Sequence, residues 1–157
     1  MDKNSDIVVG QTAPDFTLLT TDGGEVTISK LRGKKVVLYF YPKDMTSGCT
    51  IQAQEFSAIA TEYVKEGVLL FGISPDNIES HIKFIARDSI TYPLLADVGH
   101  TVADVYGVWL EKSMYGKKYM GIERSTFVID DKGKLEAIYR KVKPEGHAAR
   151  VLLDLIK

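Results

Sequence analysis

The segment Val36-Val37-Leu38-Tyr39-Phe40-Tyr41 constrains the fold more than any other part of this 157-residue chain. Every residue in it is β-branched, aliphatic or aromatic, which is typical of a central strand buried on both faces. Pro42 follows at once and ends the strand, because proline has no N–H to donate to a sheet ladder. The run therefore predicts the central strand of a sheet that has other structure packed against both of its faces.

The rest of the chain alternates between strand and helix patterns. Short strands are expected at 15–20, 26–28, 68–73 and 94–95, helices at 49–65, from Pro75, at 101–106 and at 144–156, and a hairpin over 125–140 around the turn Asp131-Lys132-Gly133. Strands alternating with helices, followed by a terminal hairpin and helix, predict an α/β fold with a central mixed β-sheet flanked by helices. No repeat or low-complexity linker interrupts the sequence, so we expect one domain over residues 1–157.

Composition excludes several classes of function. The chain has 20 basic and 21 acidic residues without a like-charge block, which argues against nucleic acid and anionic membranes as partners. The run at 36–41 is far shorter than the roughly 20 apolar residues that span a bilayer. Residues 1–9 are largely polar and do not resemble a secretory signal. A single cysteine cannot form an intrachain disulfide, so a cytoplasmic location is expected.

That cysteine, Cys49, is the main candidate for chemistry. A lone cysteine is commonly a small buried hydrophobic residue, but this one follows a loop that runs from Pro42 to Gly48 and begins the predicted helix. Unpaired N–H groups at a helix N-terminus favour the nucleophilic thiolate over the thiol. Gly48 would allow backbone amides to approach a substrate closely. Thr46 can direct its hydroxyl at the sulfur or at a substrate oxygen.

These residues carry a resemblance to a known family. Pro42-x-x-x-Thr46-x-x-Cys49 is similar to the active-site motif of peroxiredoxins, and the preceding Tyr39-Phe40-Tyr41 resembles their peroxiredoxin Q, or bacterioferritin comigratory protein, subgroup. Further matching segments occur in the same order: Ala13-Pro14-Asp15-Phe16, Gly72-Ile73-Ser74, Tyr106-Gly107-Val108-Trp109, Glu111-Lys112, Tyr115-Gly116 and Arg124-Ser125-Thr126-Phe127-Val128-Ile129-Asp130. The resemblance covers most of the chain.

The resemblance implies a thioredoxin-like fold and a thiol-dependent peroxidase that needs neither metal nor cofactor. Cys49 matches the peroxidatic cysteine, which becomes a sulfenic acid when it attacks hydrogen peroxide or an organic hydroperoxide. Thr46 matches the residue that hydrogen-bonds the peroxide, and Pro42 the one that shields the pocket from water. Arg124 matches the arginine that fixes the thiolate and stabilises the leaving oxygen; without the motif it would be interpreted as an exposed charge at a strand end.

Two positions depart from the subgroup pattern. Many members carry a resolving cysteine five residues after the peroxidatic one, where this chain has Gln54. The sulfenic acid must then meet an external thiol, for which thioredoxin, glutaredoxin and glutathione are candidates. A resolving cysteine removed by substitution would leave the same pattern. Ser47 stands where proline is usual, which loosens the loop without being expected to abolish the peroxidase step.

Other functions on the same fold remain open. A sensor or holdase would be oxidised once and would pass that oxidation to a partner without steady turnover. A thioredoxin-type disulfide reductase is disfavoured, because Thr46 occupies the place of its second cysteine. The enzyme itself is expected to be a monomer or a weak dimer.

The remaining polar residues are expected to be structural or solvated. His81, His100 and His147 are scattered and make a poor metal site. Asp97 is expected at the surface or at a helix cap. The Tyr41 hydroxyl could support the loop beside the motif.

Overall fold

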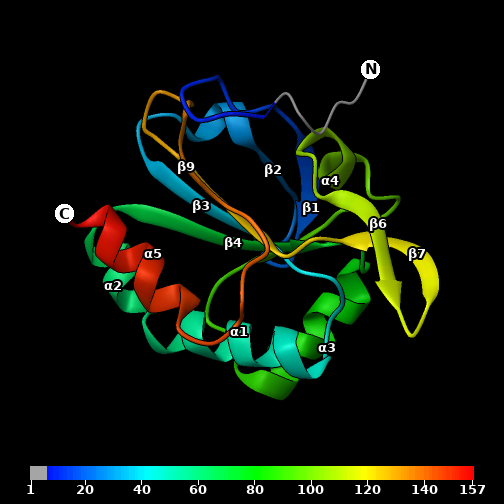
Figure 1. Cartoon of the computed structure of the whole chain (residues 1–157). Coiled ribbons are helices and arrows are strands. Elements are labelled where there is room, and N and C mark those ends of the chain that lie inside the picture. Colours follow the sequence, from blue (N-terminus) through cyan, green and yellow to red (C-terminus); the bar gives the residue numbers. More distant parts are fainter. Residues whose placement is uncertain (1–6) are drawn as a thin grey trace.

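The computed structural model describes residues 7–157. Residues 1–6, part of the segment expected to lack a secretory signal, lie outside the described residues. A seven-stranded sheet with the order β2-β1-β5-β4-β3-β8-β9 forms the centre of the molecule (Figure 1). Its strands are β1 (Thr17–Thr20), β2 (Glu25–Thr27), β3 (Lys35–Phe40), β4 (Val68–Ser74), β5 (Leu94–Ala96), β8 (Ser125–Ile129) and β9 (Leu135–Tyr139).

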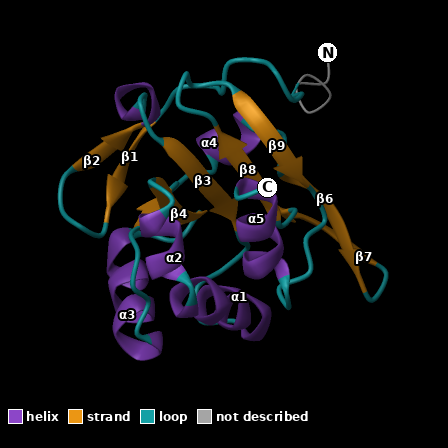
Figure 2. Cartoon of the chain, turned by 90° about the vertical axis from the view of Figure 1, so that its left-hand side faces the viewer, coloured by secondary structure: helices purple, strands orange, loops and turns teal. Residues whose placement is uncertain are grey.

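The sheet is mixed, as the sequence predicted. β3, β4 and β5 run parallel to one another, whereas β8 lies antiparallel to β3 and β1 antiparallel to β5. A separate two-stranded ribbon, β6 (Trp109–Met114) and β7 (Lys117–Ile122), projects from one end of the body (Figures 1 and 2). The sequence analysis placed no strands in this ribbon.

Helices cover both faces of the sheet. α1 (Ser47–Ala58), α2 (Ala60–Lys65), α3 (Ile78–Asp88) and α5 (His147–Leu155) lie on one side, and the short α4 (Thr101–Val105) lies on the other (Figure 1). No helix within residues 7–157 combines the length and the apolar character required to cross a bilayer.

Strand β3 has the two-sided burial expected of it. Its alternate residues Val36, Leu38 and Phe40 enter the core on the α4 side, while Val37, Tyr39 and the following Tyr41 enter the core under α1 and α5. Because side chains alternate along a strand, a run that is apolar at every position supplies both cores at once.

Three helices differ from their predicted bounds, one of them α5, which begins at His147 and not at residue 144. The expected helix over 49–65 breaks at Ile59, whose ψ of 16° leaves the helical range, and this break rotates the following turn. Tyr63 is therefore buried, whereas Val64, which lies in the predicted helix, is 73% exposed. The helix expected from Pro75 begins at Ile78, because Asn77 caps it by accepting a hydrogen bond from the Ser80 N–H.

Candidate active site

Three elements meet at the edge of the sheet where β3 ends. In the antiparallel pairing of β3 with β8, Phe40 lies opposite Ser125, so Arg124 comes to the end of β3. Pro42 stops β3 there, and the chain turns through residues 42–46 into α1. This topology brings Arg124 beside the first turn of α1, although 75 residues separate it from Cys49.

Cys49 lies in that first turn with its sulfur beside a guanidinium. Arg124 Nη2 is 3.5 Å from Cys49 Sγ. The cysteine is only 1% exposed and packs in the core with Tyr39, Ala53 and Phe56. A positive charge and the N-terminal end of a helix both stabilise a sulfur anion. The site therefore combines an apolar floor with one cation aimed at the sulfur.

Gln52 holds the same guanidinium from its other side. Its Oε1 accepts a hydrogen bond of 2.6 Å from Arg124 Nη1, and its side chain is fully buried. Gln52 Nε2 has no hydrogen-bond partner among the described residues. The sequence analysis missed Gln52, since a polar residue on a helix gives no local signal that it is buried.

Gly48 leaves room for this arginine. A Cβ at position 48 would lie 3.1 Å from Arg124 Nη2 and 3.4 Å from Pro144 Cγ. A side chain here would displace the guanidinium from the sulfur. The structure thus gives Gly48 a packing role, since it leaves room for the guanidinium.

The loop before Cys49 carries the other motif residues. Pro42 is half-buried, and the exposed Thr46 donates its hydroxyl hydrogen to the Lys43 carbonyl at 2.8 Å. Between them, Met45 has a φ of 64°, a left-handed conformation that is costly for a residue with a long side chain. The Thr46 hydroxyl points at neither the sulfur nor the helix N–H groups.

A buried polar network supports this loop from beneath. Asp44 accepts hydrogen bonds from Tyr41 at 2.6 Å and from Ser80 at 2.7 Å, and its other contact is His81 Nδ1 at 2.7 Å. His81 Nε2 faces the Leu95 carbonyl at 2.8 Å. Since a carbonyl only accepts, His81 donates from Nε2 to Leu95, and its Nδ1 lies against the Asp44 carboxylate. The predicted support of the loop by Tyr41 is confirmed.

The same network contains a set of candidate metal-ligating atoms. Atoms of Asp44, Asp76 and His81 lie within 4.8 Å of one another. The carboxylate of Asp76 is already engaged by the Ser74 hydroxyl and by the Asp44 N–H. Burial and the negative charge of Asp44 raise the pKa of Tyr41 well above its usual value, so its hydroxyl stays protonated. Hydrogen bonds among the protein's own groups account for this cluster.

A hollow of about 380 Å³ lies beside Arg124. Pro42, Leu110, Glu111, Lys112, Glu123, Arg124, Lys141 and Val142 line it. Lys112, on β6, donates from Nζ to the Ile122 carbonyl at 2.8 Å. Burial, with the nearby charge of Arg124, lowers the pKa of Lys112. Arg124 lines this hollow and also contacts Cys49, so the hollow lies next to the active site, although Cys49 itself does not line it.

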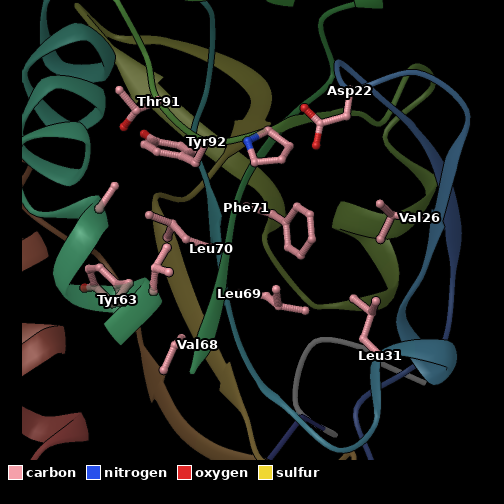
Figure 3. Close-up of a pocket in the computed structure, with 13 residues that line it drawn as sticks. Asp22, Val26, Leu31, Tyr63, Val68, Leu69, Leu70, Phe71, Thr91 and Tyr92 are labelled. Carbon is pink, nitrogen blue, oxygen red and sulfur yellow. The ribbon is translucent and has the colours of Figure 1, made fainter. Parts of the chain in front are cut away.

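A second hollow, of about 340 Å³, lies on another part of the molecule (Figure 3). It follows the outer edge of β4, where β5 pairs only with Gly72–Ser74 and leaves the start of β4 without a neighbour on that side. Leu69, Leu70, Tyr63 and Tyr92 are among the residues that line it. None of its lining residues belongs to α1 or to the active-site loop, so it is separate from the cysteine.

The other polar residues have structural positions. His147 Nε2 lies 2.8 Å from the Thr126 hydroxyl, and burial, followed by the charge of Arg124, lowers the pKa of His147 to about 4. His100 stacks on Trp109. Asp97 caps α4 by accepting from the N–H groups of Val102 and Ala103, so the predicted cap is confirmed, while its 1% exposure excludes a surface position.

Comparisons with known proteins agree with this geometry. The AhpC/TSA family matches residues 9–138. A putative peroxiredoxin bcp from Helicobacter pylori (strain J99) is 48% identical over 147 residues, 94% of this chain and 97% of that protein. Xanthomonas campestris peroxiredoxin Q superposes with a TM-score of 0.88 and 38% identity, covering 94% of this chain and 96% of that chain. A yeast mitochondrial 1-Cys peroxiredoxin superposes with a TM-score of 0.78 and 28% identity, covering 93% of this chain and 73% of that chain.

These similarities confirm the predicted thioredoxin-like fold, since the peroxiredoxin Q structure matches nearly the whole of the described sheet and its helices. They also confirm the resemblance that was based on the motif around Cys49. The chain therefore belongs to the AhpC/TSA family, as a peroxiredoxin of the Bcp, or peroxiredoxin Q, subgroup, and is a thiol-dependent peroxidase.

Proposed function

We propose that Cys49 reduces hydrogen peroxide and organic hydroperoxides by forming a sulfenic acid, and that an external thiol then recycles it. The observation that carries this proposal is the 3.5 Å contact between Arg124 Nη2 and Cys49 Sγ in the first turn of α1. A buried cysteine without a cation beside it would remain a thiol, whereas this arrangement stabilises the nucleophilic anion.

The peroxide step converts one thiolate and one hydroperoxide into a sulfenic acid and an alcohol, or water. The Cys49 sulfur attacks the terminal oxygen, a sulfur–oxygen bond forms, and the oxygen–oxygen bond breaks. The departing oxygen carries the electron pair as an alkoxide and then takes a proton. Arg124 is placed to stabilise this charge as it develops, which is how fixed cations lower such barriers.

The loop residues take supporting roles in this proposal. Because the Thr46 hydroxyl gives its hydrogen to Lys43, its oxygen lone pairs remain free to accept a hydrogen bond from a peroxide O–H. Pro42 lines the hollow and limits water around the sulfur. Gly48 keeps the space in which Arg124 and a substrate oxygen meet.

Recycling requires a thiol from another molecule, because Cys49 is the only cysteine in the sequence. The yeast 1-Cys peroxiredoxin is described as resolved through glutathione and thioredoxin systems, and the Xanthomonas campestris bacterioferritin comigratory protein as reducing alkyl peroxides. Thioredoxin, glutaredoxin and glutathione are accordingly the candidate reductants here. The enzyme would act as a monomer or weak dimer in a reducing compartment such as the cytoplasm, without nucleic acid or membrane partners.

The direct test is the rate at which the protein consumes hydrogen peroxide, followed by stopped flow together with the mass of Cys49. We expect a rate far above that of free cysteine at the same pH, a sulfenic acid adduct at Cys49, and complete loss of both in Cys49→Ser. Turnover should appear only when a thiol is added. A wild-type rate equal to that of free cysteine would overturn the proposal, and a single oxidation without turnover by any reductant would favour a sensor.

A further inference from the structure

The β6–β7 ribbon is the largest feature near the site that the peroxide step does not use. Figures 1 and 2 show it projecting from the end of the body. Its base is fixed to the molecule, since Ile122 is buried and Trp109 stacks on His100. Beyond that base, residues 113–120 are exposed. The ribbon therefore presents both of its distal faces to a possible partner.

One face of the ribbon continues from the hollow beside Arg124. Directly opposed residues of an antiparallel pair share a face, so Leu110 and Gly121, Lys112 and Tyr119, and Met114 and Lys117 lie on the same side. Leu110 and Lys112 line the hollow that Arg124 also lines. We call residues 110, 112, 114, 117 and 119, with Tyr115 at the tip, the hairpin face. It extends from the hollow that Arg124 lines to the end of the ribbon.

The hairpin face is both apolar and cationic. Met114 is 57% exposed, Tyr119 42% and Tyr115 96%. The hairpin face carries Lys112 and Lys117 and no acidic residue, in a chain whose net charge is −1, whereas Lys118 and Glu111 lie on the opposite face. Exposed aromatic and methionine side chains with cations at the rim are typical of protein contact surfaces.

The turn at the tip gives an independent indication. Tyr115 and Gly116 form a two-residue turn with φ values of 52° and 78°. This kind of turn favours Asn-Gly, because asparagine tolerates the left-handed conformation and a bulky aromatic residue does not. The ring of Tyr115 is almost fully exposed, so no packing within the described residues compensates for this strain. Such strain at an exposed position indicates a contact made outside the chain.

We propose that the hairpin face is the docking surface for the protein dithiol that recycles Cys49, a partner whose thiol lies in an apolar surface with an acidic rim. This inference rests on the proposed function, which requires an external thiol at a sulfur that is 1% exposed. The partner's first thiol displaces hydroxide from the sulfenic acid as water, forming a mixed disulfide. Its second thiol then releases the Cys49 thiol and leaves the partner as a disulfide.

The test compares two reductants on the same oxidised protein. Cys49 is oxidised with one equivalent of hydrogen peroxide, and its reduction is followed by stopped flow with either reduced thioredoxin or dithiothreitol. Tyr115→Asn keeps or improves the turn while removing the aromatic ring. We expect it to slow reduction by thioredoxin about tenfold, as loss of a central aromatic contact does, and to leave reduction by dithiothreitol and the peroxide step unchanged.

Charge gives a second readout. Lys117→Glu, which reverses a charge on the hairpin face, should slow thioredoxin and also flatten the decrease of its rate constant with added salt, because salt screens steering between opposite charges. Val64→Gln, which changes a residue 73% exposed on the distant α2, is the matched control and should leave every rate unchanged.

Four results would overturn the docking proposal: equal losses with dithiothreitol, no loss with thioredoxin, no reduction of the wild type by either thioredoxin or glutaredoxin, or a self-associated wild type that Tyr115→Asn dissociates in sedimentation. If the peroxidase proposal failed, the docking proposal could still be tested, because an assay that starts from a mixed disulfide needs no peroxide. A mixed disulfide of Cys49 with thionitrobenzoate tests thioredoxin docking without any peroxide step, through the same variants.

Discussion

At the scale of single residues, the guanidinium of Arg124 connects two groups that the chain brings together from different directions. Nη2 faces Cys49 Sγ, while Nη1 donates to Gln52 Oε1 at 2.6 Å. The planar fork of arginine can hold both partners at once, and the point charge of lysine cannot. The position of the cation, and not its charge alone, therefore determines how well it stabilises an anion at the sulfur.

Arg124→Lys separates charge from position. It keeps a positive charge beside Cys49 but loses the simultaneous contact with Gln52, so we expect the rate of peroxide reduction to fall by about a hundredfold. The free energy of unfolding should fall by about 1–3 kcal/mol, because the buried Gln52 Oε1 loses its donor. Stopped-flow peroxide kinetics and urea unfolding measure the two effects. A near wild-type peroxide rate would mean that charge alone is enough.

Sequence reasoning reached only part of this residue-scale picture. The motif identified Cys49, Thr46, Pro42 and Arg124, whose catalytic roles remain predictions. Gln52 could not be found in the same way, because its burial depends on Arg124, which arrives from a strand 72 residues later. The pairing of Asp44 with His81 has the same cause, since α3 places the histidine against the loop. Such contacts between distant segments leave no local pattern.

At the scale of elements, α1 determines which thiols can reach Cys49. Gln54 is exposed on this helix, with its Nε2 3.4 Å from Asp88 on α3, while Cys49 is buried. Five residues of helix correspond to a rise of about 7.5 Å. Two cysteines whose Cα atoms are more than about 7 Å apart cannot form a disulfide. An intact α1 therefore keeps position 54 away from the sulfur.

Gln54→Cys tests whether α1 can unwind. After oxidation by peroxide, we expect an internal disulfide between positions 49 and 54, accompanied by a loss of helical signal in far-ultraviolet circular dichroism. Mass analysis and thiol counting detect the bond, and Gln54→Ser is the matched control. A disulfide with unchanged helical signal, or no internal disulfide at all, would contradict this expectation.

The ribbon shows why one element escaped prediction. Strands are recognised by alternation of apolar and polar residues, which arises when one face is buried. Beyond its base the β6–β7 ribbon has two exposed faces, so Glu111, Lys112 and Ser113 follow one another without alternation. Its Tyr115-Gly116 turn also lacks the usual Asn-Gly signal. By contrast β3, buried on both faces, was predicted to within one residue at each end.

At the scale of the whole molecule, His147 connects the layers. It begins α5 and contacts Thr126 on β8, while its ring packs edge-on against Tyr139 on β9 and Phe56 on α1. Burial, together with the charge of Arg124, lowers its pKa from 6.5 to about 4. The folded protein therefore keeps this ring neutral at a pH where the unfolded chain would protonate it.

This difference makes stability depend on pH with a definite sign. Above pH 6.5 the ring is neutral in both states and costs nothing; as the pH falls from 6.5 toward about 4, the unfolded state binds the proton first and is favoured. The loss reaches about 3 kcal/mol by pH 4, from about 1.4 kcal/mol per unit of a pKa difference of about 2.5 units. His147→Gln can still bond Thr126 but does not titrate. When urea unfolding is measured across this pH range, the free energy of unfolding of the wild type should therefore fall by that amount more than that of His147→Gln. Contributions from carboxylates are common to both proteins and cancel in this difference. If the two proteins lost stability in parallel, His147 would be protonated in the folded state, and the close packing of α5 on the sheet would have to open to water as the pH falls.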